Sequence, residues 1–147
     1  MRTVMRVGSV AGLLLAGSWT IARAEEPPYT EGTVMHMTFV RTKSGGGEQY
    51  MKFLATQWKS LNEAAKKDGL VLSYHVIQSE PANKDDWELM LVTEYKNMAA
   101  LDGLEARFRP LVEKLSGSIT KAEEQAGKRG EIREVLGEKL GRELLLK

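Results

Sequence analysis

The sequence predicts an α+β domain in which one antiparallel sheet is covered on one side by helices. Three observations lead to this prediction. Short segments in which apolar and polar residues alternate, a pattern typical of strands, occur three times before residue 97. A long amphipathic segment with helical spacing follows the first of these strands, and a second apolar helical pattern follows the third. The tail after residue 131 supplies a fourth candidate strand.

The first 24 residues have the pattern of a secretory signal peptide. Arg2 and Arg6 form a short basic region, residues 7–16 are an apolar run, and Ala22-Arg23-Ala24 is a small-x-small cleavage pattern. Cleavage after Ala24 lowers the basic residues from 21 to 18 against 20 acidic ones, which changes the net charge from +1 to about −2. We therefore expect a periplasmic or secreted protein.

The composition excludes several classes of protein. The chain has no cysteine, which rules out disulfides, a lipid anchor on cysteine and any thiolate metal or thiol enzyme site. The apolar part of the leader and every later stretch fall short of the roughly 20 apolar residues of a membrane span. Without an excess of basic residues, we expect no nucleic-acid partner. Outside the cytoplasm, reduced cofactors such as NADPH are not at hand, so binding ranks above catalysis.

The chain after the leader begins with a short extended segment. Residues 25–32 contain Pro27-Pro28 and are expected to lead into a single domain over residues 33–147. Thr33 to Arg41 is rich in β-forming residues and alternates, which predicts the first strand. Lys43 to Gly47 contains three consecutive glycines and predicts a flexible turn. An anion site is the alternative, but a phosphate-binding loop has its lysine after the glycines.

Glu48 to Asp68 is predicted to form the first helix. Lys66 and Lys67 suit its negative end, and Gly69 is well placed as the stop. Its apolar residues recur at helical spacing: Tyr50, Met51, Leu54, Trp58, Leu61 and Ala65.

The second and third strands are expected to form a hairpin. Leu70 to Gln78 and Asp86 to Lys96 alternate, and Ser79 to Asp85 between them has turn composition. Asn97 suits the cap of a second helix. Gly103 and Pro110 are expected to break or kink that helix. Its apolar positions are Leu101, Leu104, Phe108, Leu111, Val112 and Leu115.

The last third of the chain is the hardest to interpret. Residues 116–131 are polar and charged, and part of this segment is expected to be helical. In the tail, residues 132–147, apolar residues every fourth position fit either a helix or one side of a strand. Gly137 and Gly141 would each cost a helix about 1 kcal/mol, which favours a strand. The resulting order β-α-β-β-α-β is that of a ferredoxin-like sandwich, with the third strand between the first and second.

Alternation along the strands assigns side chains to two faces of the sheet. The helix-facing set is large and apolar: Met35, Met37, Phe39, Leu70, Leu72, Tyr74, Val76, Trp87, Leu89, Leu91, Thr93 and Tyr95. The open face is mixed: Val34, His36, Thr38, Val40, Val71, Ser73, His75, Ile77, Glu88, Met90, Val92 and Glu94. Half of the open-face residues are Val, Ile or Met, which is typical of an interface. A second copy related by a twofold axis would cover them.

This pattern resembles the dimeric α/β-barrel superfamily, in which two ferredoxin-like subunits place their sheets face to face. The segment from Gly32 to Leu101, with VLSYHVIQSEPANKDDWELMLVTEYKNMAAL at its centre, is similar to small exported bacterial proteins of that type with no assigned role. The resemblance extends over residues 32–147. It implies a homodimer. It also admits monooxygenase or haem-handling activity, although no catalytic motif of the superfamily occurs here.

The two histidines are the main candidates for chemistry. His36 and His75 are both assigned to the open face, with Glu88 expected opposite His75. Imidazoles and a carboxylate converging in a partly apolar cavity would bind a transition metal or supply a general base, and a single histidine would ligate haem iron. The alternative is that both histidines are neutral, hydrogen-bonded residues of an interface. The candidate ligand-binding set is His36, His75, Glu88, Thr38, Ser73 and Met90, of which His36, His75 and Glu88 would hold a metal.

The expected function is therefore the binding of a small, mainly apolar ligand in a semi-polar cavity of an exported homodimer. Two alternatives remain open. One is a monooxygenase-like or haem-handling enzyme that uses His36 or His75. The other is a structural dimer whose interface is filled. Tyr74, Trp87, Tyr95 and Trp58 are assigned to the core rather than to a ligand.

Overall fold

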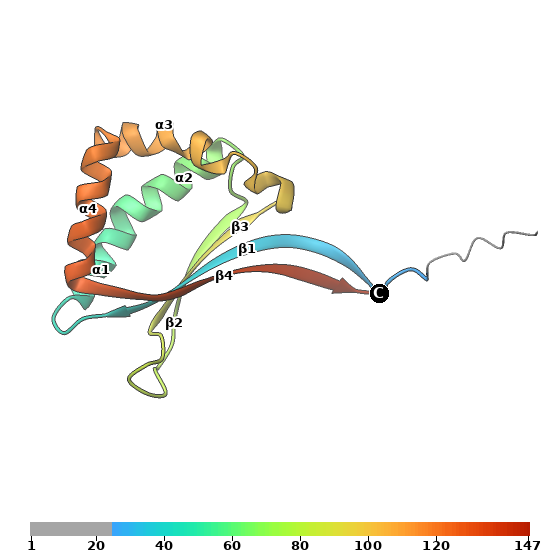
Figure 1. Ribbon diagram of the computed structural model, residues 1–147, viewed down its shortest axis with the longest axis horizontal. Helices are drawn as coiled ribbons and strands as arrows, with labels where there is room; N and C mark the ends of the chain where they lie inside the picture. The colour runs from blue at the N-terminus through green and yellow to red at the C-terminus, as the bar shows by residue number, and fades with distance from the viewer. Residues whose placement is uncertain (1–24) are drawn as a thin grey trace, which may run out of the picture.

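The computed structural model describes residues 25–147, so the predicted signal peptide lies outside the described residues. The elements follow in the order β1 (Tyr29–Thr42), α1 (Gly47–Phe53), η1 (Leu54–Trp58), α2 (Lys59–Lys67), β2 (Ser73–Gln78), β3 (Leu89–Tyr95), η2 (Met98–Leu101), α3 (Leu104–Ser116), α4 (Ile119–Ile132) and β4 (Arg133–Leu146). Figure 1 shows the helices gathered on one side of the sheet.

The sheet has four strands in the order β2-β3-β1-β4, and every neighbouring pair is antiparallel. The predicted α+β class is confirmed, and the structure fits a ferredoxin-like fold. The third strand lies between the first and second, as expected, and the tail forms a strand rather than a helix.

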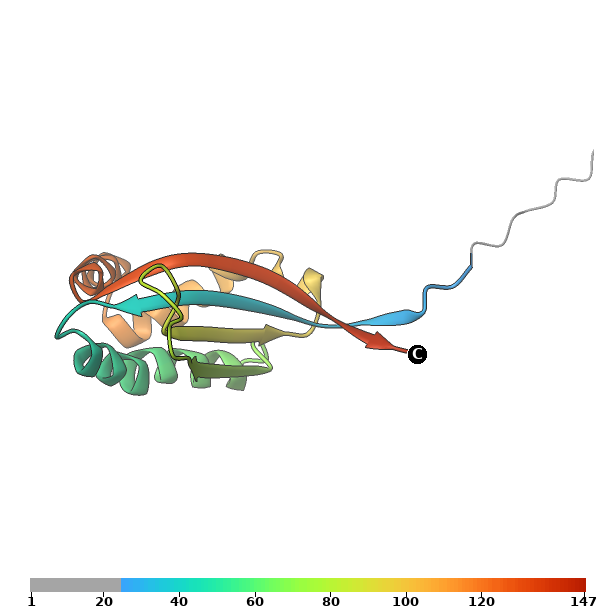
Figure 2. The ribbon, with the colours of Figure 1, turned by 90° about the horizontal axis from the view of Figure 1, so that it is seen from below.

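β1 and β4 are much longer than β2 and β3, at 14 residues each against six and seven. Their outer ends pair with each other alone, with Tyr29 opposite Leu146, and form a two-stranded arm beyond the rest of the sheet (Figures 1 and 2). Arg142 and Glu31 form an ion pair across the arm. Pairing with the tail therefore extends the first strand four residues before its predicted start at Thr33.

The first helix spans nearly the predicted range and is continuous through α1, η1 and α2. Its middle, Leu54–Trp58, is a π-helical segment that periodicity did not reveal. The helix ends where Gly69 takes a left-handed φ of 70°. The amide of Gly69 bonds the Lys66 carbonyl at 3.1 Å, and that of Leu70 bonds the Ala65 carbonyl at 2.9 Å. These two bonds form a Schellman stop, which explains why glycine is needed at this position.

The second helical region is divided into three pieces. Asn97 caps the short η2 turn by accepting a hydrogen bond from the Ala100 amide at 3.0 Å. Gly103, with φ 63°, separates η2 from α3, so the expected break occurs there. Pro110, by contrast, lies inside α3 without ending it. The polar segment after residue 116 forms the complete helix α4, which begins at a Ser118 cap.

The core consists of two clusters between the sheet and the helices. One joins Val40, Leu89 and Leu91 of the sheet to Tyr50 and Leu54. The other joins Val34, Tyr95 and Val71 to Ala65. Val34 and Val40 are fully buried, although alternation assigned them to the open face.

The predicted faces of β1 are therefore reversed. Register pairs Val34 with Tyr95 and Val40 with Leu89, and directly opposed residues in an antiparallel pair point to the same side. Met35, Met37 and Phe39 consequently occupy the open face. Both sides of β1 are apolar, so alternation alone had no polar side by which to choose.

Three smaller assignments also change. Val71 packs in the core next to Ala65, because the chain at that point has not yet entered β2. Trp87 lies edge-on to Phe39 at 5.7 Å between ring centroids, which places it with the open-face residues. The assignments of Leu89, Leu91, Thr93 and Tyr95 to the helix side are confirmed by the same register.

The two loops at this end of the sheet are docked onto neighbouring elements. Gly46 lies against the end of α4, where an added Cβ would stand 2.4 Å from the Ile132 carbonyl oxygen. Lys43 bonds that carbonyl through its amide at 2.9 Å and the Gly130 carbonyl through Nζ at 2.7 Å. The predicted flexible turn is thus held in place.

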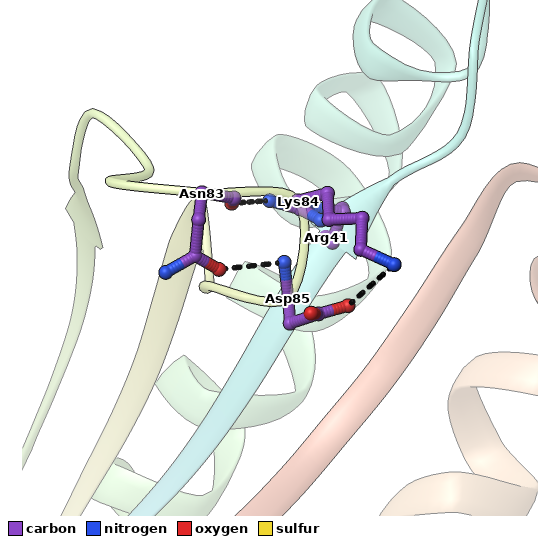
Figure 3. Close-up of polar contacts among 4 residues, drawn as sticks. All are labelled: Arg41, Asn83, Lys84 and Asp85. Carbon is purple, nitrogen blue, oxygen red and sulfur yellow. Dashed lines mark hydrogen bonds and ion pairs between the residues drawn. The ribbon is translucent and has the colours of Figure 1, made fainter.

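The β2–β3 loop is attached to β1 through Arg41. Its guanidinium donates to the Asn83 carbonyl at 2.6 Å, and the Asn83 side chain accepts from the Asp85 amide at 2.8 Å (Figure 3). Asp86 accepts hydrogen bonds from the Ala82 and Trp87 amides, which lower the pKa of its carboxyl group. These contacts orient the loop that carries Trp87.

Candidate functional site

Three rows of opposed residues make up the open face of the sheet. They are read across β2, β3, β1 and β4 as Ser73, Glu94, Met35 and Gly141, then His75, Val92, Met37 and Lys139, then Ile77, Met90, Phe39 and Gly137. Six of these twelve are apolar and larger than alanine, and the helices lie on the other side of the sheet. The face has an apolar centre, because β1 contributes three large apolar side chains there.

A hydrogen-bonded polar cluster occupies one edge of this face. Glu94 of β3 accepts from Ser73 Oγ at 2.5 Å and from Thr33 Oγ1 at 2.6 Å. His75 Nε2 lies 3.2 Å from Ser73 Oγ. Because the single hydroxyl proton of Ser73 is directed to Glu94, the ring nitrogen of His75 must donate in that contact.

The cluster stabilises a negative charge at Glu94. The hydrogen bonds from Ser73 and then Thr33, with a smaller contribution from the nearby His75, lower the pKa of Glu94, while partial burial opposes them. A carboxylate with a lowered pKa is a weak general base. Ser73 donates its proton to this carboxylate instead of to a histidine, so the arrangement lacks the order of a serine nucleophile and its base.

His36 and Thr38 lie on the helix-facing side of the sheet. His36 is opposite Thr93 and Thr38 is opposite Leu91, both helix-facing residues of β3. His36 Nε2 is 3.6 Å from Glu138 Oε2 on β4, and its side chain is 38% exposed. The expectation that His36 and His75 share one face is wrong, because β1 has the opposite phase to the one predicted.

Glu88 is also displaced from its expected neighbour. Val92, not Glu88, is opposite His75, and the Glu88 carbonyl accepts from the Ser79 amide at the end of the hairpin. The Glu88 carboxylate accepts from the amide and hydroxyl of Thr42 at 3.0 and 2.7 Å. Glu88 therefore secures the end of β1, some distance along the hairpin from His75.

Of the six predicted ligand-binding residues, the structure brings together three on the open face, namely Ser73, His75 and Met90. Glu94 and Thr33 were not in that set, and neither was the rim formed by Phe39 and Trp87. Next to this rim is an open pocket of about 240 Å³ that also involves Leu136 and Lys139. Lys139 Nζ lies 5.6 Å from the centre of the Phe39 ring. Alternation could have located Glu94, but the pairing of Thr33 with it needed the tertiary structure.

The proposed metal set His36, His75 and Glu88 does not converge. Within residues 25–147, no three His, Cys, Asp or Glu side chains are arranged to hold a metal ion. A haem ligand would have to be one histidine acting alone. In the same part of the chain, no helix has the length and apolar character needed to cross a membrane.

Fold and site together define a small α+β protein with a four-stranded antiparallel sheet, one of whose faces is open and partly apolar. No protein-family model and no curated protein matches the sequence. Among solved structures the chain is similar to the crystal structure of HapK from Hahella chejuensis, with a TM-score of 0.48 and 12% identity. The match covers 75% of this chain and 91% of that one. Membership of the dimeric α/β-barrel superfamily stays a prediction.

Proposed function

We propose that this protein is exported, forms a homodimer through the open face of its sheet, and binds a small, mainly apolar ligand in the cavity so enclosed. The observation that carries the proposal is the apolar centre of that face, formed by Met35, Met37, Phe39, Ile77, Met90 and Val92. A contiguous apolar surface of this kind is typical of an interaction site. A second copy offers the same surface in return, as a twofold interface requires.

Features of β4 are compatible with the close approach of another sheet. Gly137, Lys139 and Gly141 are its open-face residues opposite β1, so only one of the three has a side chain beyond the backbone. The Met37 side chain covers Gly141, where an added Cβ would lie 3.0 Å from the Met37 methyl carbon. The two glycines thus leave room next to Met37 and Phe39, where a ligand or a partner sheet could contact the backbone.

The β1–β4 arm offers further apolar surface for a partner. Leu144, Leu145 and Leu146 are 50%, 48% and 84% exposed, at the end of the chain where the arm extends past the helices. Apolar residues at this density on an exposed two-stranded arm favour burial against another chain.

The kind of ligand follows from the composition of the face. Binding sites for small molecules are mostly apolar with a few convergent polar groups. Here the apolar centre lies between the Ser73–His75–Glu94 cluster and the Phe39–Trp87 rim. This arrangement supports a ligand with an apolar body and one group that bonds to the polar cluster. No observation favours catalysis by His36 and His75 together, since they lie on opposite faces.

Two neighbouring positions on β2 give a matched test of the dimer. Ile77 is 42% exposed on the open face, and Val76 is 37% exposed on the other side of the same strand. We expect Ile77→Lys to raise the dimer dissociation constant at least about tenfold, because a buried unpaired charge is costly, while Val76→Lys leaves it unchanged. Analytical ultracentrifugation measures both. A monomeric wild-type protein at micromolar concentration would refute the proposed dimer.

Native mass spectrometry of the protein purified from its own periplasm tests the ligand. A dimer that carries a co-purified small molecule supports the proposal. A ligand-free dimer that binds no apolar probe such as 8-anilinonaphthalene-1-sulfonate at its interface supports the structural alternative instead.

A further inference from the structure

A second surface, remote from the open face, has the features of a ligand site. A groove between the α1–η1 segment and the helices α3 and α4 has two adjoining parts of about 220 and 310 Å³. Both parts share Phe53, Gln57, Gln125 and Arg129. The groove is therefore continuous, and Arg129 lies where its two parts meet.

The two parts differ in chemistry. The first is mainly apolar and is lined by side chains from three helical segments, with Phe53, Trp58, Leu61, Val112 and Leu115 as its apolar members. The second is cationic, with Lys52, Lys128 and Arg129 in its wall and no aspartate or glutamate. Lys52 already pairs with Glu48 at 2.8 Å on the surface of α1. Positive charge at one end and apolar surface at the other suit an amphipathic anion.

Arg129 has no carboxylate partner among the described residues, and neither does Arg133. Each guanidinium lies over an aromatic ring instead, Arg129 at 4.3 Å from the centre of Phe53 and Arg133 at 5.5 Å from the centre of Tyr50. The Nε atoms of both are buried without a hydrogen-bond partner. Burial and repulsion by Arg133 lower the pKa of Arg129. A bound anion would relieve this repulsion.

The local backbone contributes to the shape of the groove. The π-helical segment η1 ends in Gln57 and Trp58, which both line it. Such one-turn widenings of an α-helix occur frequently at functional sites. The Trp58 ring packs edge-on against Tyr74 at 5.3 Å, which holds the wall of the apolar part against the sheet.

We propose that this groove binds an amphipathic carboxylate of the medium-chain fatty acid class. The acyl chain lies in the apolar part against Trp58 and Leu115. The carboxylate accepts hydrogen bonds from Arg129 and from the side-chain amides of Gln57 and Gln125. This site lies on the helix layer, so it does not depend on dimerisation through the sheet.

Titration calorimetry with octanoate tests the proposal directly. For a ligand of this size we expect one site per chain with a dissociation constant of the order of 100 µM. The neutral analogue 1-octanol should bind at least about tenfold more weakly, because it loses the charge-assisted bonds to Arg129. Equal affinity of the two probes would overturn the role of Arg129, and no binding of octanoate at millimolar concentration would overturn the site.

Variants separate this site from general effects on the fold. Arg129→Gln should weaken octanoate binding at least about tenfold, with Arg129→Lys intermediate between the two. Arg109→Gln is the matched control, because Arg109 is an exposed arginine of α3 whose ion-pair partner, Glu113, is on its own helix. Octanoate binding unchanged in Arg129→Gln would refute the proposal.

A substitution in the apolar part guards against loss of folding at Arg129. Leu115 is 47% exposed, so Leu115→Asp should leave the thermal unfolding temperature nearly unchanged while repelling the carboxylate and weakening octanoate binding. Leu72→Asp, at 43% exposed and outside the groove, is its control. Equal binding by these two variants would contradict the placement of the acyl chain.

Discussion

His36 and His75 lie on opposite faces of the sheet because their partners on β3, Thr93 and Val92, are consecutive residues. Consecutive residues of a strand point to opposite sides, and β3 separates the two histidine-bearing strands. Two strand spacings alone put the histidines about 9–10 Å apart in the plane of the sheet. The only two histidines of the chain therefore belong to different environments.

The two histidines should contribute independently to stability. His36→Ala loses an exposed contact with Glu138, which is worth less than about 1 kcal/mol. The free energy of unfolding of the double variant His36→Ala/His75→Ala should equal the combined effects of the single variants within about 0.5 kcal/mol. Urea denaturation of the four proteins measures this. A coupling above about 1 kcal/mol would indicate a shared site.

Glu94 should make stability depend on pH in the acidic range. Its folded-state pKa is lowered, first by Ser73 and then by Thr33, so the folded protein holds the carboxylate more favourably than the unfolded chain does. This contribution is complete above the unfolded pKa, about 4.5, and is lost as the pH falls through the lower folded pKa. Glu94→Gln should therefore be less stable than wild type at neutral pH, and the difference should shrink below about pH 4.

Urea denaturation across this range checks the prediction, with Glu123→Gln on the exposed surface of α4 as the control for loss of one charge. A difference between wild type and Glu94→Gln that stays constant down to about pH 3 would contradict the role of the Ser73–Glu94–Thr33 cluster.

The glycines before α1 should respond differently to alanine. At Gly46 an added methyl would collide with the Ile132 carbonyl, at 2.4 Å from the oxygen. Gly46→Ala should lower the free energy of unfolding by about 2 kcal/mol or more, because backbone must shift. At Gly47 the nearest atom is the Thr42 hydroxyl oxygen at 3.6 Å, an ordinary contact. Gly47→Ala should leave stability unchanged or raise it by up to about 1 kcal/mol.

Thermal and urea unfolding of the two variants compare adjacent positions that differ in space but not in residue type. If Gly46→Ala were as stable as Gly47→Ala, the loop would not be docked against α4 as described, and the flexible turn expected from its composition would be the better account.

Most of the secondary structure is encoded locally. The helical repeat through Glu48 to Asp68, its glycine stop and the Asn97 cap all depend on residues within a few positions of one another. The two glycines of the tail favoured the strand that the structure has. The signals are local because hydrogen bonds of helices and caps join residues three to five positions apart.

The faces of β1 and the contents of the site were decided by tertiary structure. Valine occurs at 34 and 40, and methionine or phenylalanine at 35, 37 and 39, so either side could have formed the core. The choice depended on which register with β3 placed Val34 and Val40 beneath the helices. Phe53 and Arg129, which meet in the groove, are likewise brought together only by packing of α1 against α4. Contacts between such distant segments follow from strand register and layer packing, which no short stretch of sequence specifies.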